Sequence, residues 1–420
     1  MLDVNLIRQN SEKVKEGVMA KGFDVGLVEE FLRIDDEWRK TVGKIDEMRG
    51  EQNALSKKFA VSRSEDEVSR ARDLRVDVSK LDLKEKELDK KRSEILGAIP
   101  NLPFSNVPIG KNEKENVELR ISGKKRDFKK EGIVPKDHLQ IAENLGIVDF
   151  ERGAKVAGSG FYYLKNDGVL LELALVRYAL DFLRREGFDI WLTPDAAKDT
   201  FYLGTGYAPK GPEAQTYLIE GTDLGLIATS EVTLAGLHAK EIFKKEELPK
   251  FYAGYSQCFR QEAGAYGKYS KGLYRVHQFT KIEMFAYVRP EESEEAHKRL
   301  LNLEEKLWQS MGIPYRVLEM CTGDLGSQAA RKYDLEAWMP GRGDWGEITS
   351  VSNTTDYQAR RLGIKYKEGE GETKFVHTLN GTAIATARAI IAILENYQRK
   401  DGSVEVPKVL RGYVGKRVTR

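Results

Sequence analysis

The chain of 420 residues is long enough for two domains and a sizeable core. Its 68 Lys and Arg against 66 Asp and Glu give a formal net charge of only +2, so global charge provides no case for nucleic-acid binding. The N-terminus lacks an apolar signal core and no segment approaches the length of a membrane span, which predicts a cytoplasmic protein without membrane contact. The two cysteines, Cys258 and Cys321, show no paired ligand spacing, so no zinc site is expected.

Residues 34–99 carry a repeating apolar pattern that differs from everything after them. Mostly apolar positions step alternately by four and three residues in two segments, one from Ile34 to Phe59 and one from Ala71 to Ile99. This heptad spacing, interrupted by a short polar stretch, predicts an antiparallel helical hairpin with arms of roughly 40–50 Å. The pattern alone leaves three interpretations open: a dimerising coiled coil, a structural spacer or a nucleic-acid-binding arm.

The three prolines of IPNLPFSNVPIG (99–110) end this pattern and predict a linker. The expected domains are therefore 1–108, which contains the hairpin, and 109–420. The second domain mixes strand-like and helical segments without βαβ regularity, and it contains neither a P-loop nor a G-x-G-x-x-G motif after a strand. Hairpin-like pairs such as 251–285 favour a mainly antiparallel sheet flanked by helices, so the predicted fold class is α+β.

The stretch FRQEAGAYGKYSKGLYRVHQFTKIEMF (259–285) carries the strongest chemical signal. Two strand-like runs flank a loop rich in Gly, Lys and Tyr, with Arg260 before it and Arg275 after it. A glycine loop with arginines at both roots suits the binding of a bent polyphosphate. Strand alternation from Arg275 to Glu283 would place cations, an aromatic ring and a carboxylate on one face, which predicts a pocket there.

A second informative segment is HTLNGTAIATARAIIAILENYQ (377–398), which predicts a strand, a small-residue turn and a helix with Arg388 in its first turns. Together the two segments resemble motifs 2 and 3 of class II aminoacyl-tRNA synthetases. Further phrases resemble the seryl-tRNA synthetase family: ATSEV (228–232), GEITSVSNTTDYQARR (346–361), TLNGT (378–382) and DGSVEVPKVLRGY (401–413). These phrases occur in family order, so the resemblance covers essentially the whole chain.

The resemblance implies a two-step reaction. The carboxylate of serine attacks the α-phosphate of ATP, and the 3′-terminal ribose of tRNA(Ser) then takes the seryl group from the adenylate. The resemblance also implies Mg²⁺, a homodimer formed through the motif 1 helix and strand within 168–194, and an N-terminal arm that grips the tRNA; whether tRNA(Sec) is also charged stays open. Two alternatives are a ligase that loads a carrier protein, whose known examples lack the long arm, and a silent paralogue that only binds tRNA.

Site residues follow from the resemblance position by position, with Arg260 and Arg388 as the catalytic pair. For ATP it implies Arg260, Gln261, Glu262, Arg275, Val276, Phe279, Glu347, Ile348, Thr349, Ser350 and Arg388. For serine it implies Thr229, Ser230, Glu231, Arg260, Glu283, Asn380 and Thr382. For Mg²⁺ it implies Glu347 and Ser350. For the tRNA we expect Lys57, Lys58, Arg63, Arg70, Arg72 and Arg75 near the tip of the hairpin.

Serine is small, so its selection is a physical problem. Rejecting alanine requires a buried partner for the hydroxyl, which discriminates by about 10⁴ to 10⁵ when that partner is left unpaired. Glu283 with Thr382 beside it is the expected partner. No insertion is long enough for an editing domain, so discrimination is expected at this one pocket.

Overall fold

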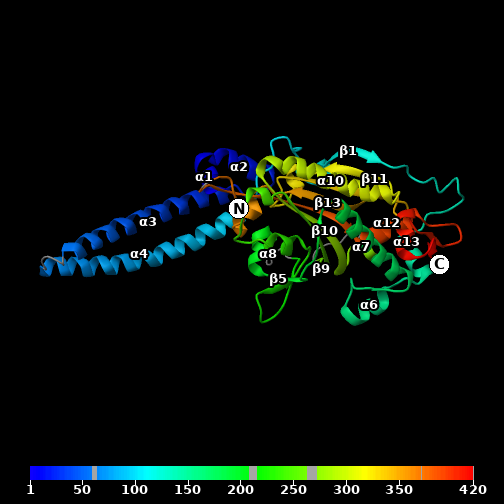
Figure 1. The fold of residues 1–420 in the computed structure, drawn as a ribbon, viewed down its shortest axis with the longest axis horizontal. Helices are drawn as coiled ribbons and strands as arrows, with labels where there is room; N and C mark the ends of the chain where they lie inside the picture. Colours follow the sequence, from blue (N-terminus) through cyan, green and yellow to red (C-terminus); the bar gives the residue numbers. More distant parts are fainter. Residues whose placement is uncertain (59–63, 208–214, 263–271, 370, 420) are drawn as a thin grey trace. The chain divides into compact units, whose positions relative to one another are not determined.

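The computed structural model describes residues 1–58, 64–207, 215–262, 272–369 and 371–419 (Figure 1). It divides the chain into two compact units, Met1–Leu102 and Pro103–Arg420. The division falls inside the expected linker but earlier than the expected boundary at 108/109. The reason is that Phe104 donates its N–H to the Ala330 carbonyl at 3.0 Å and Val107 packs in a cluster with Met320, so these residues belong to the second unit.

The first unit is helical. Its elements are α1 (Val4–Gln9), α2 (Ser11–Ala20), α3 (Gly26–Lys58) and α4 (Glu65–Ala98). Helices α3 and α4 lie side by side (Figure 1), and ion pairs such as Arg49–Asp82 and Glu51–Arg70 show that they run antiparallel. The predicted hairpin is therefore confirmed. Helix α3 begins before residue 34, because Val28 is buried against the short helices α1 and α2.

An ion-pair cluster joins three helices of this unit. Asp35 of α3 is 3% exposed and accepts hydrogen bonds from Arg8 of α1 at 2.7 Å and from Arg92 of α4 at 2.6 Å. Burial would raise the pKa of the Asp35 carboxyl, but the two guanidinium groups outweigh it and hold the pKa below its ordinary value. Removing this carboxylate would leave two arginines without their shared partner.

An eight-stranded sheet forms the centre of the second unit, and every neighbouring pair except β4–β9 is antiparallel. In spatial order its strands are β1 (Val117–Ser122), β11 (Tyr315–Glu319), β12 (Arg331–Met339), β13 (Asp344–Asn353), β16 (His377–Ala385), β10 (Gln278–Val288), β9 (Lys250–Phe259) and β4 (Asp189–Leu192). The predicted, mainly antiparallel sheet is confirmed. Strand β10 begins only at Gln278, so Arg275 is not part of the predicted strand alternation.

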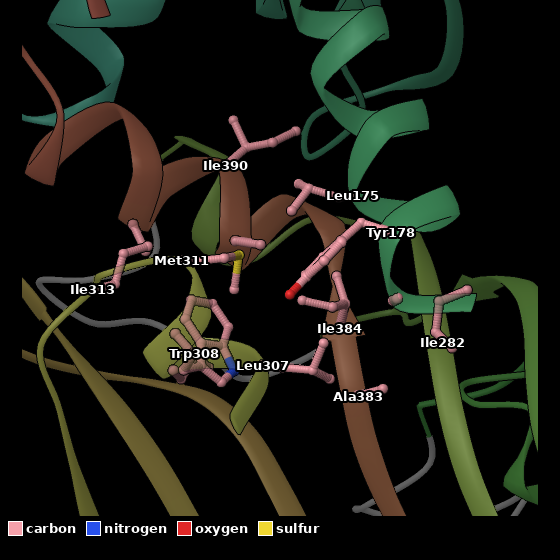
Figure 2. Packing of buried hydrophobic residues seen from close by; sticks show 14 of the residues in the cluster. Leu175, Tyr178, Ile282, Leu307, Trp308, Met311, Ile313, Ala383, Ile384 and Ile390 are labelled. Carbon is pink, nitrogen blue, oxygen red and sulfur yellow. The ribbon is translucent and has the colours of Figure 1, made fainter. Parts of the chain in front are cut away.

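Three helices, α7 (Asp167–Arg185), α10 (Ser293–Ser310) and α12 (Thr386–Asn396), share one large apolar core with the sheet. Figure 2 shows this core, with side chains from all three helices and from β10 and β16. Ile282 and Met284 of β10 belong to this core, whereas Phe285 belongs to a separate cluster with α9 (Glu231–Gly236) and α11 (Tyr357–Leu362). Alternation along β10 therefore turns Lys281 and Glu283 away from the large core.

Smaller elements complete the second unit. The remaining helices are α5 (His138–Leu145), α6 (Phe150–Ala157), α8 (Asp199–Thr205) and α13 (Arg411–Val414), with short 3₁₀ turns, including one at Gly272–Tyr274. The other strands are β2 (Val148–Asp149), β3 (Tyr163–Leu164), β5 (Ala196–Lys198), β6 (Tyr217–Leu218), β7 (Leu224–Leu226), β8 (Ile242–Phe243), β14 (Lys365–Lys367), β15 (Thr373–Phe375), β17 (Val404–Glu405) and β18 (Val418–Thr419). Both cysteines are free and buried. Across the described ranges, no helix combines the length and apolar character needed to cross a membrane.

Candidate active site

One cavity collects side chains from both segments that the sequence singled out. Its lining comes from the end of β9, the turn at 272–274, β10, β13, β16 and the start of α12. The lining residues are Arg260, Glu262, Leu273, Tyr274, Val276, Phe279, Lys281, Glu347, Ile348, Thr349, Ser350, Thr382, Ala385, Ala387 and Arg388. Because β10, β13 and β16 are adjacent strands, the sheet brings residues that are up to 128 positions apart in the numbering, from 260 to 388, to one place.

Arg388 and Glu347 form an ion pair in this cavity, with 2.9 Å between Nη1 and Oε1. The guanidinium carbon of Arg388 also lies 5.2 Å from the centre of the Tyr274 ring. Desolvation would raise the pKa of Glu347, but the charges of Arg388 and Lys332 outweigh it and lower the pKa to about 2. Glu347 is therefore an ionised carboxylate, able to act as an oxygen ligand, at physiological pH.

Arg260 follows β9 and stands over Phe279, with its guanidinium carbon 5.2 Å from the ring centre. Its backbone is fixed on both sides, since its N–H donates to the His277 carbonyl and its own carbonyl lies 2.8 Å from His277 Nδ1. Arg275 instead pairs with Glu262 at 3.2 Å, and it is exposed and does not line the cavity. The arrangement thus offers a cation beside an aromatic face in the cavity, while Arg275 is held outside it by Glu262.

A buried polar network adjoins the cavity. Glu231 and Glu283 are both 0% exposed, and the Asn380 amide bridges them, with Nδ2 donating to Glu231 Oε2 at 3.0 Å and to Glu283 Oε1 at 3.1 Å. Lys281 Nζ is ion-paired with Glu283 and donates to Thr229 Oγ1 at 3.1 Å. When Glu231 is ionised, two carboxylates against one ammonium leave a buried group of net negative charge, which suits a small cationic ligand.

Glu231 is the carboxylate of this network with the most distinctive electrostatics. Burial, together with the nearby Glu283 carboxylate, raises its pKa to about 7, although hydrogen bonds and Lys281 partly oppose the shift. Its oxygens accept from Gln358 Nε2 at 2.8 Å and from the Tyr207 hydroxyl at 3.0 Å. The ionised form is therefore held by donors but is still costly to create in this pocket.

Four predicted site residues use their side chains mainly for structural contacts, and two of them, Ser230 and Gln261, do not line the cavity. The Ser230 hydroxyl donates to the Gly254 carbonyl at 3.3 Å, and Gln261 Nε2 donates to the Thr216 carbonyl at 2.9 Å. Ile348 is part of the large apolar core, and Thr349 donates its hydroxyl to the buried Glu304 at 2.9 Å. Ile348 and Thr349 still line the cavity, whereas Ser230 and Gln261 support it from outside.

The predicted arm residues fall into three groups. Lys57, Lys58, Arg72 and Arg75 are exposed on α3 and α4. Arg70 is also exposed, but it is held by two hydrogen bonds to Glu51 at 2.8 and 2.9 Å. Arg63 lies outside the described residues.

Residues that sequence reasoning left without a role also belong to the site. Lys281 stands between Glu283 and Thr229; strand alternation predicted it on the same pocket face as Glu283, but no ligand was assigned to it. Tyr207 and Gln358 hold Glu231 from 24 and 127 positions away. These two contacts could not be predicted from a local sequence pattern, because they form only when the fold brings distant segments together.

Two different family models match the two parts of the chain. Residues 1–103 match the seryl-tRNA synthetase N-terminal domain, and residues 217–397 match the tRNA synthetase class II core domain (G, H, P, S and T). The serine–tRNA ligase of Rubrobacter xylanophilus is 50% identical, covering 100% of this chain and 99% of the relative. That of Dictyoglomus turgidum is 48% identical, covering 99% of this chain and 98% of the relative.

Solved structures agree with these relatives. The seryl-tRNA synthetase of Pyrococcus horikoshii complexed with ATP superposes with a TM-score of 0.93 at 42% identity, covering 100% of this chain and 99% of that one. The sheet, the cavity and the class II core match together define a class II aminoacyl-tRNA synthetase. With its N-terminal domain and full-length relatives, the chain belongs to the seryl-tRNA synthetase family, the serine–tRNA ligases.

Proposed function

We propose that this enzyme forms seryl-adenylate from serine and ATP in the cavity between Arg260 and Arg388, and then transfers the seryl group to the 3′-terminal ribose of tRNA(Ser). The observation that carries the proposal is that Arg260, Phe279, Glu347 and Arg388 line one cavity, with the Glu231–Asn380–Glu283 network adjoining it. Adenylate formation needs positive charge around three phosphates and an in-line approach, and little covalent chemistry from the protein.

For ATP, the proposed roles use the charges and rings at the cavity. Arg260 bridges the serine carboxylate and the α-phosphate, and Arg275 binds the γ-phosphate after leaving its partner Glu262. Phe279 and Arg388 cover the two faces of adenine, an arrangement supported by the aromatic and guanidinium groups already facing the cavity. Glu262 accepts from the adenine amino group.

For serine, Glu231 and Thr229 bind the ammonium, and Glu283 with Thr382 binds the hydroxyl. Full burial of both glutamates supports this division, because a buried carboxylate without its ligand partner is costly and so discriminates strongly against alanine. Asn380 fixes the distance between the two carboxylates by donating to both.

The divalent cation is part of the same proposal. Glu347 is held ionised, and it lines the cavity together with the Ser350 hydroxyl, so a hard cation such as Mg²⁺ finds two suitable oxygen donors there. When bound, Mg²⁺ would neutralise phosphate charge. The ion pair with Arg388 already holds the Glu347 carboxylate in place, so this metal ligand does not need to be ordered when ATP binds.

The experiment that tests the catalytic proposal is ATP–pyrophosphate exchange with each of the twenty amino acids, with Mg²⁺ and without tRNA. Exchange is expected with serine and not with alanine or threonine, and it should disappear in Arg260→Ala. Exchange with another amino acid would remove the serine assignment, and exchange that survives Arg260→Ala would remove the assigned site.

For tRNA, we propose that the α3–α4 hairpin binds tRNA(Ser) through basic side chains near its tip. The exposure of Lys57 and Lys58 supports this role, and phosphate contacts of this kind weaken as salt rises. Deleting 34–99 should leave adenylate formation intact and abolish charging. Lys57→Ala/Lys58→Ala should raise KM for tRNA, whereas Lys40→Ala, whose amine pairs with Asp36 at 2.7 Å, should not. Equal charging by the truncated enzyme would refute the role of the arm.

We also propose a homodimer through α7 and β4, in the cytoplasm. The support is an exposed apolar surface that includes Leu173 of α7, which is 57% exposed, and Leu192 of the edge strand β4, which is 76% exposed. Leu173→Glu should shift the sedimentation coefficient from dimer to monomer. Leu119→Glu, on the exposed opposite edge strand, is the matched control and should remain dimeric. A monomeric wild-type enzyme at micromolar concentration would contradict the proposal.

A further inference from the structure

A buried carboxylate in the helix that carries Arg388 joins three segments that are far apart in sequence. Glu395, in the last turn of α12, is 1% exposed. Its Oε1 accepts from the backbone N–H of His138 at 3.1 Å and lies 3.2 Å from His138 Nδ1, while its Oε2 accepts from the N–H of Gly341 at 2.9 Å. The carboxylate therefore fixes the start of α5 and the turn between β12 and β13 to the end of α12.

The other side of the His138 ring reaches the chain that leads into the cavity. The N–H of Leu273 donates to His138 Nε2 at 3.3 Å. An Nε2 that accepts carries no proton, so the neutral ring has its proton on Nδ1 and donates it to Glu395. The approach is close, since a Cβ on Gly272 would lie 2.3 Å from Nε2. The ring thus has one defined tautomer and one defined backbone partner.

Residue Leu273 leads directly into groups that face ATP in the proposed function. The next residue is Tyr274, whose ring lies against Arg388, and after it comes Arg275. Helix α12 carries Arg388 in its first turn and Glu395 in its last turn, so it holds the segment 272–275 at two points. One point is the Arg388–Tyr274 contact, and the other is Glu395 acting through His138.

We propose that His138, oriented by Glu395, is a positioning residue for ATP binding. It holds the backbone of the Leu273–Arg275 segment in place beside Arg388. This inference rests on the proposed function, because it takes the cavity to be the ATP site. No contact between His138 and substrate is involved. A loss of the ring should therefore affect ATP binding through backbone placement and leave the serine network, which uses other elements, as it is.

The test measures KM for ATP and for serine separately by serine-dependent ATP–pyrophosphate exchange in two variants. His138→Met keeps a similar volume and offers only a weak sulfur acceptor, whereas the side-chain carbonyl of His138→Gln can accept from Leu273. The Met variant should raise KM for ATP about five- to tenfold, the effect of one lost hydrogen bond, with KM for serine unchanged. The Gln variant should stay within about twofold of wild type for both substrates.

A matched control comes from the second histidine with a glutamate partner, His238, whose Nδ1 lies 2.7 Å from Glu241 and whose Nε2 lies 2.9 Å from the Tyr252 hydroxyl. His238→Met should leave KM for ATP unchanged. Equal KM for ATP in wild type and His138→Met would overturn the inference, as would equal losses for ATP and serine, or a Gln variant as impaired as the Met variant.

Folding is monitored by circular dichroism. If His138→Met does not fold, His138→Leu, which also offers no acceptor to Leu273, takes its place; an unchanged KM for ATP there overturns the inference. A wild-type chain without serine-dependent exchange would count against the proposed function instead. Calorimetric titration of the same variants with ATP would then still decide the inference, with weaker binding expected for Met and near wild-type binding for Gln.

Discussion

The affinity for serine should depend on pH through Glu231. Burial raises the pKa of this carboxyl to about 7, and in the proposed function only its ionised form binds the serine ammonium. Since the group is protonated below its pKa, the ionised fraction falls about tenfold when the pH is lowered from 8 to 6. KM for serine should therefore rise about tenfold, which corresponds to about 1.4 kcal/mol. The loss should continue at about tenfold per pH unit below pH 6.

The assay is ATP–pyrophosphate exchange with saturating ATP between pH 5.5 and 8. Glu231→Gln should bind serine weakly at every pH and lose the slope, because its amide does not titrate. Glu305→Gln alters another buried carboxyl, one that pairs with Arg120 outside the cavity, and should keep the wild-type slope. A KM for serine that is flat from pH 6 to 8, or a Glu231→Gln enzyme that keeps the slope, would refute the reasoning.

Three further predictions concern single side chains. Asn380→Ala removes the donor shared by the two pocket carboxylates, so KM for serine should rise about tenfold or more with KM for ATP nearly unchanged, as measured by exchange kinetics. Arg388→Lys keeps the charge but loses the planar group, so KM for ATP should rise more than KM for serine; equal effects would contradict the adenine-stacking role. Asp35→Asn should lower the free energy of unfolding of the first unit by about 2–4 kcal/mol, measured by urea denaturation. Because the pKa of Asp35 lies below its unfolded value, its stabilising contribution should be present above the unfolded pKa and be lost as pH falls through the folded pKa, so wild type and variant should converge in acid.

The helical hairpin could be predicted because its signal is local. A heptad pattern needs only the residues of one helix, and Ile34, Ile45, Leu74 and Leu88 are indeed buried in the structure. The start of α3 could not be predicted in the same way. The segment from Gly26 is helical because it packs on α1 and α2, and that packing is tertiary information.

In the candidate site, too, features with a local sequence signal could be predicted and tertiary contacts could not. The resemblance to class II motifs implied one site for Arg260, Phe279, Glu347 and Arg388, and the structure places all four in one cavity. The prediction that Arg275 shares a strand face with Glu283 was wrong, because the chain forms a 3₁₀ turn at 272–274 and the strand starts later. Donors to Glu231 from distant segments were equally invisible, since hydrogen-bond partners of a buried carboxylate depend on the fold.

The two buried thiols make this enzyme convenient for fluorescence. The chain has only two cysteines, and both are 0% exposed, so neither should react readily with a maleimide on the folded protein. Gly50 of α3 is exposed, and a Cβ added there meets nothing within 4 Å. A dye attached through Gly50→Cys would therefore mark the hairpin alone, and replacing a mid-helix glycine should not weaken the helix. Binding of tRNA to the hairpin, as proposed above, could then be followed in real time, separately from the chemistry.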